Sequence, residues 1–224
     1  MAEGVDAEGL LRVSRALLAN HREDACFDLL ESRIEEFPED VLLLKQICNA
    51  GLAAEKAEES LPYSLRLAAL AETPVELTSA LKEVSRLGRR LDLEEVVGEL
   101  LVKEEKEVID WCVISQLQEL RGDSLASDEA LVEAAKLTDG ILVLSQRVRL
   151  LESRSEYTKA AEAMREMLTL PEGNRPVHLK KLVDLLATGG EIDKALVEVD
   201  NWKLMAPGDR SAWMRQSYWL MEDS

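Results

Sequence analysis

Aromatic residues are scarce in this sequence: four tryptophans, three tyrosines and two phenylalanines make up 4% of 224 residues. Runs of β-branched residues bounded by turn residues are also scarce, which leaves an all-β fold little support. No apolar run approaches the ~18 residues of a membrane-spanning helix, so we expect no membrane partner. The first eleven residues are acidic and lack a basic segment, unlike a secretory signal peptide.

Cysteine and histidine are too few and too dispersed to suggest a metal site. The three cysteines, Cys26, Cys48 and Cys112, form no C-x-x-C pair, and His21 and His178 are the only histidines. Zinc and similar ions need clustered ligands of these types. Dispersed thiols in Leu- and Ala-rich segments indicate small buried side chains in a reducing compartment, so we expect a cytoplasmic protein.

Sequence motifs of catalysis are missing as well. The chain has no phosphate-binding glycine loop, no dinucleotide fingerprint, no H-E-x-x-H and no G-x-S-x-G. Its many paired glutamates stand beside Lys or Arg at spacings typical of solvated helix faces. We therefore expect no enzyme activity and no cofactor.

Basic residues are outnumbered, with 27 Lys and Arg against 44 Asp and Glu and a formal net charge of -17. Such a surface repels phosphate backbones, so we expect no nucleic-acid partner. The acidity is explained either by solubility or by attraction of basic partners, and the sequence leaves both open.

The composition is dominated by good helix formers: Leu, Ala, Glu, Lys and Arg. Hydrophobic residues make up 46% of the chain. Pro38 and Pro74 are 36 residues apart, as are Pro171 and Pro207. The interval between the two pairs divides into three units of similar length, which indicates an internal repeat. We predict one domain over 1–224, built from units at about 6–38, 40–73, 74–106, 107–139, 140–171 and 176–207, with a partial unit at 209–224.

Each unit is predicted to contain two amphipathic helices joined by a short polar turn. Leu179, Leu182, Val183 and Leu186, for example, follow the i, i+3, i+4, i+7 pattern of a helix face. One such helix cannot bury its apolar face alone, so neighbouring helices must cover it. The expected first helices are 6–19, 40–53, 74–87, 107–120, 141–153, 176–187 and 209–221, and the expected second helices are 23–36, 56–71, 92–104, 127–137, 156–169 and 191–205.

Several helix boundaries carry local signals. Thr73 and Glu76 flank Pro74 in the pattern of a capping box, and Asp40 and Asp209 are placed to cap their helices. Pro62 falls inside a predicted helix, so either that helix begins near residue 61 or it is kinked there.

These features resemble the tetratricopeptide repeat family. Ala195 precedes Pro207 by 12 residues, as the small residue of a family second helix precedes its closing proline, and Gly190 lies near the expected turn. The resemblance implies an all-α, right-handed superhelix of αα-hairpins: about six helix pairs and a terminal helix. It also implies a concave face, lined by the first helices, that binds peptides. Residues 75–140 match the family motifs poorly, so another αα-hairpin class stays open there.

Two sets of first-helix residues are candidate peptide contacts. Lys45 and Asn49 lie one turn apart, similar to half of the family's carboxylate clamp, although the next first helix offers Ala80, Leu81 and Lys82 without an asparagine. The second set could form a cationic strip for an acidic peptide. Ordinary solvated side chains are the alternative for both. The members of this strip are Gln146, Arg149, His178, Lys181 and Arg215.

Trp202, Trp213 and Trp219 cluster near the end of the chain, where a first helix has no second helix to cover it. We interpret them as packing between repeats, and the exposed end as a sign that the native array is longer. The leading hypothesis is a non-catalytic scaffold for a protein or peptide partner. The alternatives are a regulatory or substrate-docking arm of a larger enzyme and a module that self-associates through its C-terminal end.

Overall fold

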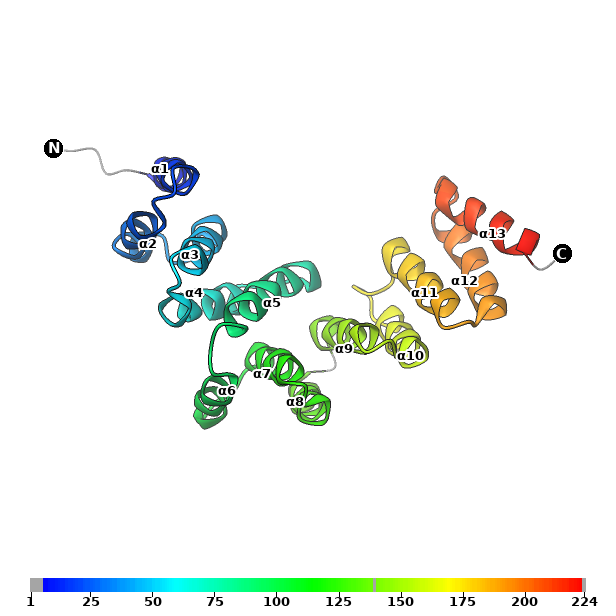
Figure 1. The fold of residues 1–224 in the computed structure, drawn as a ribbon. Coiled ribbons are helices and arrows are strands. Elements are labelled where there is room, and N and C mark those ends of the chain that lie inside the picture. Colours follow the sequence, from blue (N-terminus) through cyan, green and yellow to red (C-terminus); the bar gives the residue numbers. More distant parts are fainter. Residues whose placement is uncertain (1–5, 139, 223–224) are drawn as a thin grey trace. The chain divides into compact units, whose positions relative to one another are not determined.

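The structure is a computed structural model that describes residues 6–138 and 140–222, with side chains to residue 218. Over those residues it contains thirteen α-helices and one 3-10 helix and no strand, which confirms the predicted all-α fold (Figure 1). The first helices of the units are α1 (Ala7–Ala19), α3 (Val41–Ala53), α5 (Pro74–Gly88), α7 (Val108–Arg121), α9 (Ile141–Ser153), α11 (Pro176–Thr188) and α13 (Arg210–Glu222). The second helices are α2 (Glu23–Glu31), α4 (Ala57–Ala69), α6 (Leu93–Val102), α8 (Ser124–Leu137), α10 (Tyr157–Thr169) and α12 (Ile192–Met205).

The chain packs as two compact units, residues 1–134 and 135–224. In the first unit α1 packs on α2, α3 on both α2 and α4, and α4 on α5. In the second unit α9, α10, α11 and α12 each pack on the next helix along the chain, up to α13. The unit 135–224 is thus a consecutive stack of αα-hairpins, whereas in the unit 1–134 α7 contacts α4, α5 and α6; one continuous domain over 1–224 stays a prediction.

The turns within the hairpins repeat with a fixed geometry. In five of them, over the residues described, an amide N–H reaches back to a carbonyl five residues earlier, the bond that closes a Schellman motif. The residue before each of these amides has a positive φ: His21, Glu55, Gly122, Ser155 and Gly190. The N···O distances are 3.0 Å for Arg22–Leu17, 2.7 Å for Lys56–Gly51, 3.0 Å for Asp123–Gln118, 2.8 Å for Glu156–Leu151 and 2.8 Å for Glu191–Leu186.

Small buried side chains mark where the two helices of a hairpin touch. The Cys26 thiol donates to the Ser14 carbonyl at 3.3 Å, and the Ser115 and Ser127 hydroxyls lie 3.1 Å apart. The Cys48 thiol on α3 donates to the Ser60 carbonyl on α4 at 4.0 Å. The two groups of each of these contacts are 12 residues apart in sequence. The repeat predicted from proline spacing therefore has a structural counterpart, because the same pair of positions meets in the α1/α2, α3/α4 and α7/α8 hairpins.

One alternative for α4 is wrong, and two helix boundaries differ from the predicted ones by three residues or more. The helix α4 begins at Ala57 and includes Pro62, so it does not begin near residue 61. The segment predicted as one helix over 23–36 ends at Glu31 and resumes as a 3-10 helix, Ile34–Glu36. The helix α8 begins at Ser124, three residues earlier than predicted.

The predicted caps are confirmed. Asp40 accepts from the amides of Leu42 and Leu43, and Asp209 accepts from that of Ser211. Thr73 and Glu76 form the capping box at the start of α5.

Candidate functional site

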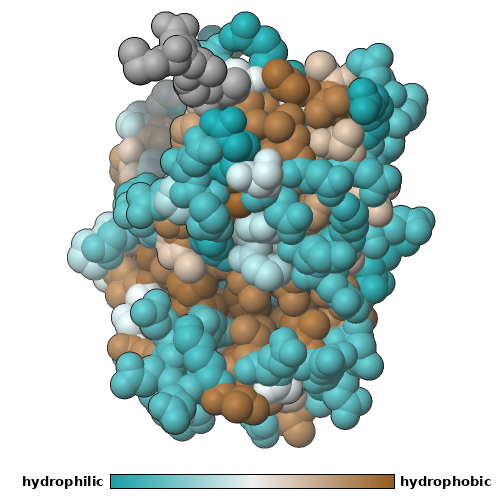
Figure 2. Space-filling model, turned by 90° about the vertical axis from the view of Figure 1, so that its left-hand side faces the viewer, coloured by the Kyte–Doolittle hydropathy of each residue, from teal (hydrophilic) through white to brown (hydrophobic). Residues whose placement is uncertain are grey.

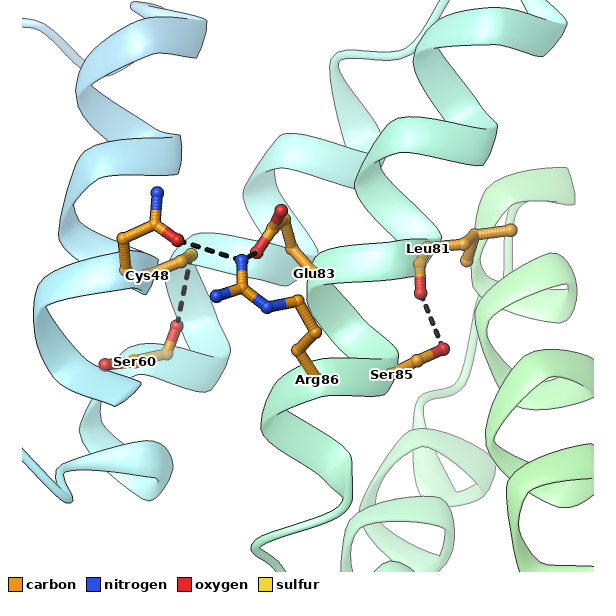
Figure 3. Close-up of polar contacts among 7 residues, drawn as sticks. Cys48, Ser60, Leu81, Glu83, Ser85 and Arg86 are labelled. Atoms are coloured by element: carbon orange, nitrogen blue, oxygen red, sulfur yellow. Dashed lines mark hydrogen bonds and ion pairs between the residues drawn. The ribbon is translucent and has the colours of Figure 1, made fainter. Parts of the chain in front are cut away.

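A row of polar side chains links the first helices of the unit 1–134. Asn49 on α3 accepts a hydrogen bond from the Arg86 guanidinium on α5 through its Oδ1 atom at 2.8 Å. The same Arg86 nitrogen also donates to Glu83, one turn earlier on α5, at 2.6 Å. Figure 3 shows Arg86 lying between the α3 side chains and Glu83. Residues 37 positions apart in sequence thus share one hydrogen-bonded group.

The row continues from α5 to α7. The Ser85 hydroxyl donates to the Leu81 carbonyl at 2.7 Å and accepts from the Gln116 side-chain amide at 2.9 Å. Gln116 is almost fully buried, although it is a polar residue. The step from α5 to α7 therefore satisfies a buried amide that would otherwise be costly to bury, whereas the step from α3 to α5 joins more exposed groups.

Lys45, one turn before Asn49, lies half-buried on α3. The pKa of Glu76 is held below its usual 4.5, mainly by the Thr73 hydroxyl and nearby backbone amides and to a smaller extent by Lys45. The structure thus brings Lys45 near the acidic start of α5 while it commits the Asn49 amide oxygen to Arg86. The Asn49 amide nitrogen keeps its donor capacity, and the carboxylate clamp at Lys45 and Asn49 stays a hypothesis.

In the unit 135–224 the predicted strip is also a series of paired groups. Gln146 on α9 is 2% exposed, and its side-chain oxygen accepts from Arg149 at 2.8 and 3.0 Å. Lys181 on α11 forms an ion pair with Glu152 on α9, and Arg215 on α13 forms one with Asp184 on α11. Both bonds connect one first helix with the next.

His178 occupies a different position from the rest of the strip. Its Nδ1 atom lies 2.5 Å from the carbonyl oxygen of Gly173, in the loop that precedes α11. Gly173 itself is buried, and an added Cβ atom would lie 1.7 Å from the Met167 carbonyl oxygen. The imidazole therefore holds this tightly packed loop against the start of the helix.

The charges of the strip are partly balanced within the unit. Lys181 and Arg215 each face a carboxylate, and burial lowers the pKa of Arg215. The strip is therefore of mixed charge, and α11 carries both a base, Lys181, and an acid, Asp184, that pair with neighbouring first helices. The preference of the strip for an acidic peptide stays a prediction. The two ion pairs count against it, because they already engage Lys181 and Arg215.

Sequence reasoning missed the partners that complete both rows. Glu83 and Arg86 occur at i, i+3, and Glu152 and Asp184 stand on the same helices as predicted members, but nothing local distinguishes them from other surface charges. Arg86 and Glu152 share one signal, a separation near one repeat length from the group they bind: 37 residues for Asn49–Arg86 and 29 for Glu152–Lys181.

Other kinds of site find no support in the part of the chain that the structure describes. Within residues 6–138 and 140–222, no three His, Cys, Asp or Glu side chains gather as a metal site would require. In the same ranges no helix combines the length and hydrophobicity needed to cross a bilayer.

Comparison with known proteins gives matches among solved structures. No protein-family model and no curated protein matches the chain. A thermophilic TPR protein of Thermus thermophilus is similar with a TM-score of 0.44 and 20% identity, over 96% of this chain and 98% of that one. The APC/C hetero-tetramer Cut9–Hcn1 gives 0.40 and 12%, over 97% of this chain and 43% of that one. The assembly chaperone of RpL4, Acl4, gives 0.34 and 13%, over 96% and 95%.

Proposed function

We propose that this chain is a non-catalytic scaffold that binds a peptide or partner protein along the first helices of its hairpin stacks. The observation that carries the proposal is the hydrogen-bonded polar row on those helices, from α3 through α5 to α7 and from α9 through α11 to α13. Polar groups already held in place lose little conformational freedom when a ligand arrives, which favours binding.

The chemistry of the titratable groups supports a role without catalysis. Burial raises the pKa of the Cys26 thiol to about 11 and that of Cys48 to about 12, so both are protonated near neutral pH. A protonated buried thiol is a poor nucleophile. His178 is engaged with a loop carbonyl, and the acids of the two rows are engaged with Arg or Lys.

Each row offers a partner a way to compete for existing bonds. A carboxylate on the ligand could take Arg86 from Glu83, and a basic group could take Asp184 from Arg215. The Arg215–Asp184 pair is about one third exposed and is screened by solvent, so its exchange costs less than that of Glu83, which is 15% exposed and loses its partner when Arg86 is taken. Specificity would come from the spacing of several charged groups on the ligand, which must match the spacing of the ion pairs along the first helices.

The test is affinity capture with the native full-length protein, followed by identification of what is held. Arg86→Ala and the double variant Lys181→Ala/Arg215→Ala should lose partners that the wild type retains. Lys194→Ala is the matched control, because Lys194 is also ion-paired with a glutamate but lies on the second helix α12. Circular dichroism establishes that each variant is folded. Unchanged affinity in both first-helix variants would remove the proposal.

Self-association through the C-terminal end is a second candidate function. Trp213 and Met214 on α13 are mostly exposed, whereas Trp202 is fully buried in the core beneath them. The interpretation of these tryptophans as packing between repeats fits the buried Trp202 but not the exposed Trp213, and the Trp219 side chain lies outside the described residues. Light scattering over a range of concentrations separates a self-associating module from a monomeric scaffold, and the full-length gene context tests whether the chain is a docking arm of an enzyme.

A further inference from the structure

A groove with an apolar floor lies between the second helices α6 and α8 of the unit 1–134. Trp111 and Ile114 of α7 form part of its floor, and Leu101 of α6 and Leu125 of α8 form part of its walls. Its volume is about 530 Å³, within the range of ~300–1,000 Å³ typical of ligand pockets. It is distinct from the polar row, to which α7 contributes Gln116.

The walls of the groove expose large aliphatic side chains. Leu125 is 73% exposed, Val132 is 57% exposed, and Leu101 is 44% exposed. Leu125 and Val132 are seven residues apart on α8, so they lie on one face of that helix. Grouped aliphatic side chains in a hollow, unlike scattered ones, mark interaction sites.

The rim of the same groove is acidic. Asp128, Glu129 and Glu133 of α8 line it together with the apolar side chains. The surrounding unit is acidic too: residues 1–134 contain 30 Asp and Glu against 14 Lys and Arg, a net of -16 out of the -17 of the whole chain. Figure 2 shows a face on which hydrophilic residues predominate and hydrophobic residues emerge between them. The net charge of -16 on residues 1–134 steers basic partners to the unit and opposes docking of a second copy of the unit.

We propose that this groove binds an amphipathic helix whose polar side carries Lys and Arg. The helix would place apolar residues at i, i+3 or i+4, and i+7 between α6 and α8, while its basic residues face the acidic rim. A helix suits the site because two helices bound the groove, and residues 6–138 and 140–222 present no sheet edge that an extended peptide could join.

The experiment measures binding of a synthetic amphipathic peptide, with Leu at the helical period and Lys elsewhere, by isothermal titration calorimetry. Leu125→Gln and Val132→Gln remove apolar contacts at exposed positions without opening the core, and each should weaken binding about ten-fold. Val75→Gln is the matched control, because Val75 is 79% exposed on α5 outside the groove. Control affinity should equal that of the wild type.

Charge is tested separately. Glu129→Gln should weaken binding and flatten its salt dependence, and a peptide of the same composition with its Leu residues scrambled should bind at least ten-fold more weakly.

Equal binding by Leu125→Gln, Val132→Gln and wild type would overturn the proposal, as would equal binding of the scrambled peptide. Loss of binding in Arg86→Ala with no loss in the groove variants would also overturn it, because the peptide would then occupy the first-helix row. Self-association that Leu125→Gln abolishes would overturn it too, because the occupant would then be a second copy.

Discussion

The left-handed conformation of the turn residue Gly122 can be tested by making the same Gly→Ala substitution at two glycines in different backbone conformations. Gly122 ends α7 at φ 84°, and an added Cβ there would meet no atom within 4 Å. Gly98 lies inside α6, also with open space around an added Cβ, but with helical geometry. Replacement of both glycines by alanine therefore separates backbone conformation from packing.

The two substitutions should change stability in opposite directions. An L-residue in the left-handed region costs ~1–2 kcal/mol, so Gly122→Ala should destabilise the protein by about that amount. Gly98→Ala should stabilise it by about 1 kcal/mol, the propensity difference between Ala and Gly in a helix interior. The loss of unfolded-state freedom is common to both variants and cancels in the comparison.

Urea denaturation followed by circular dichroism measures the difference. Both glycines belong to the unit 1–134, so they act on the same part of the molecule. With m-values of ~1–3 kcal/mol/M, a total difference of about 2–3 kcal/mol separates the midpoints by roughly 0.7–3 M. If the two variants shift the midpoint in the same direction, the assignment of a left-handed turn at Gly122 is wrong.

Two further predictions concern titration. The pKa of the Glu76 carboxylate is lowered because the carboxylate accepts hydrogen bonds from Thr73 and Glu72, so the stabilisation it gives is full above pH 4.5 and is lost as the pH falls below that value. In urea titrations at pH 7, Glu76→Gln should therefore be less stable than the wild type, and the difference should shrink in acid. A difference that stays constant with pH would contradict the lowered pKa. Burial raises the pKa of the Cys26 and Cys48 thiols, so neither should react with Ellman's reagent in the native protein at pH 8. Both thiols should react once urea unfolds the protein. Fast labelling of either residue in the native protein would contradict its burial.

Helix type, helix order and helix caps were determined by the sequence alone, because each depends on residues within one or two turns. The apolar period identified the helices, and Asp40, Thr73 and Glu76 capped the helices predicted for them. The turn at Gly122 follows from the same local chemistry, since glycine alone adopts its conformation without cost. The repeat was also visible, because each hairpin must present the same faces to its neighbours.

Only the tertiary structure decided which side chains meet across hairpins. Asn49 and Arg86, or Lys181 and Glu152, are ordinary surface residues in the sequence, and their bonds depend on how successive helices pack. The α6–α8 groove likewise arises from the spacing of three helices in a segment whose repeat motif is weak. Periodicity fixes which face of a helix is buried, but the distance and register between helices depend on packing of side chains far apart in the chain.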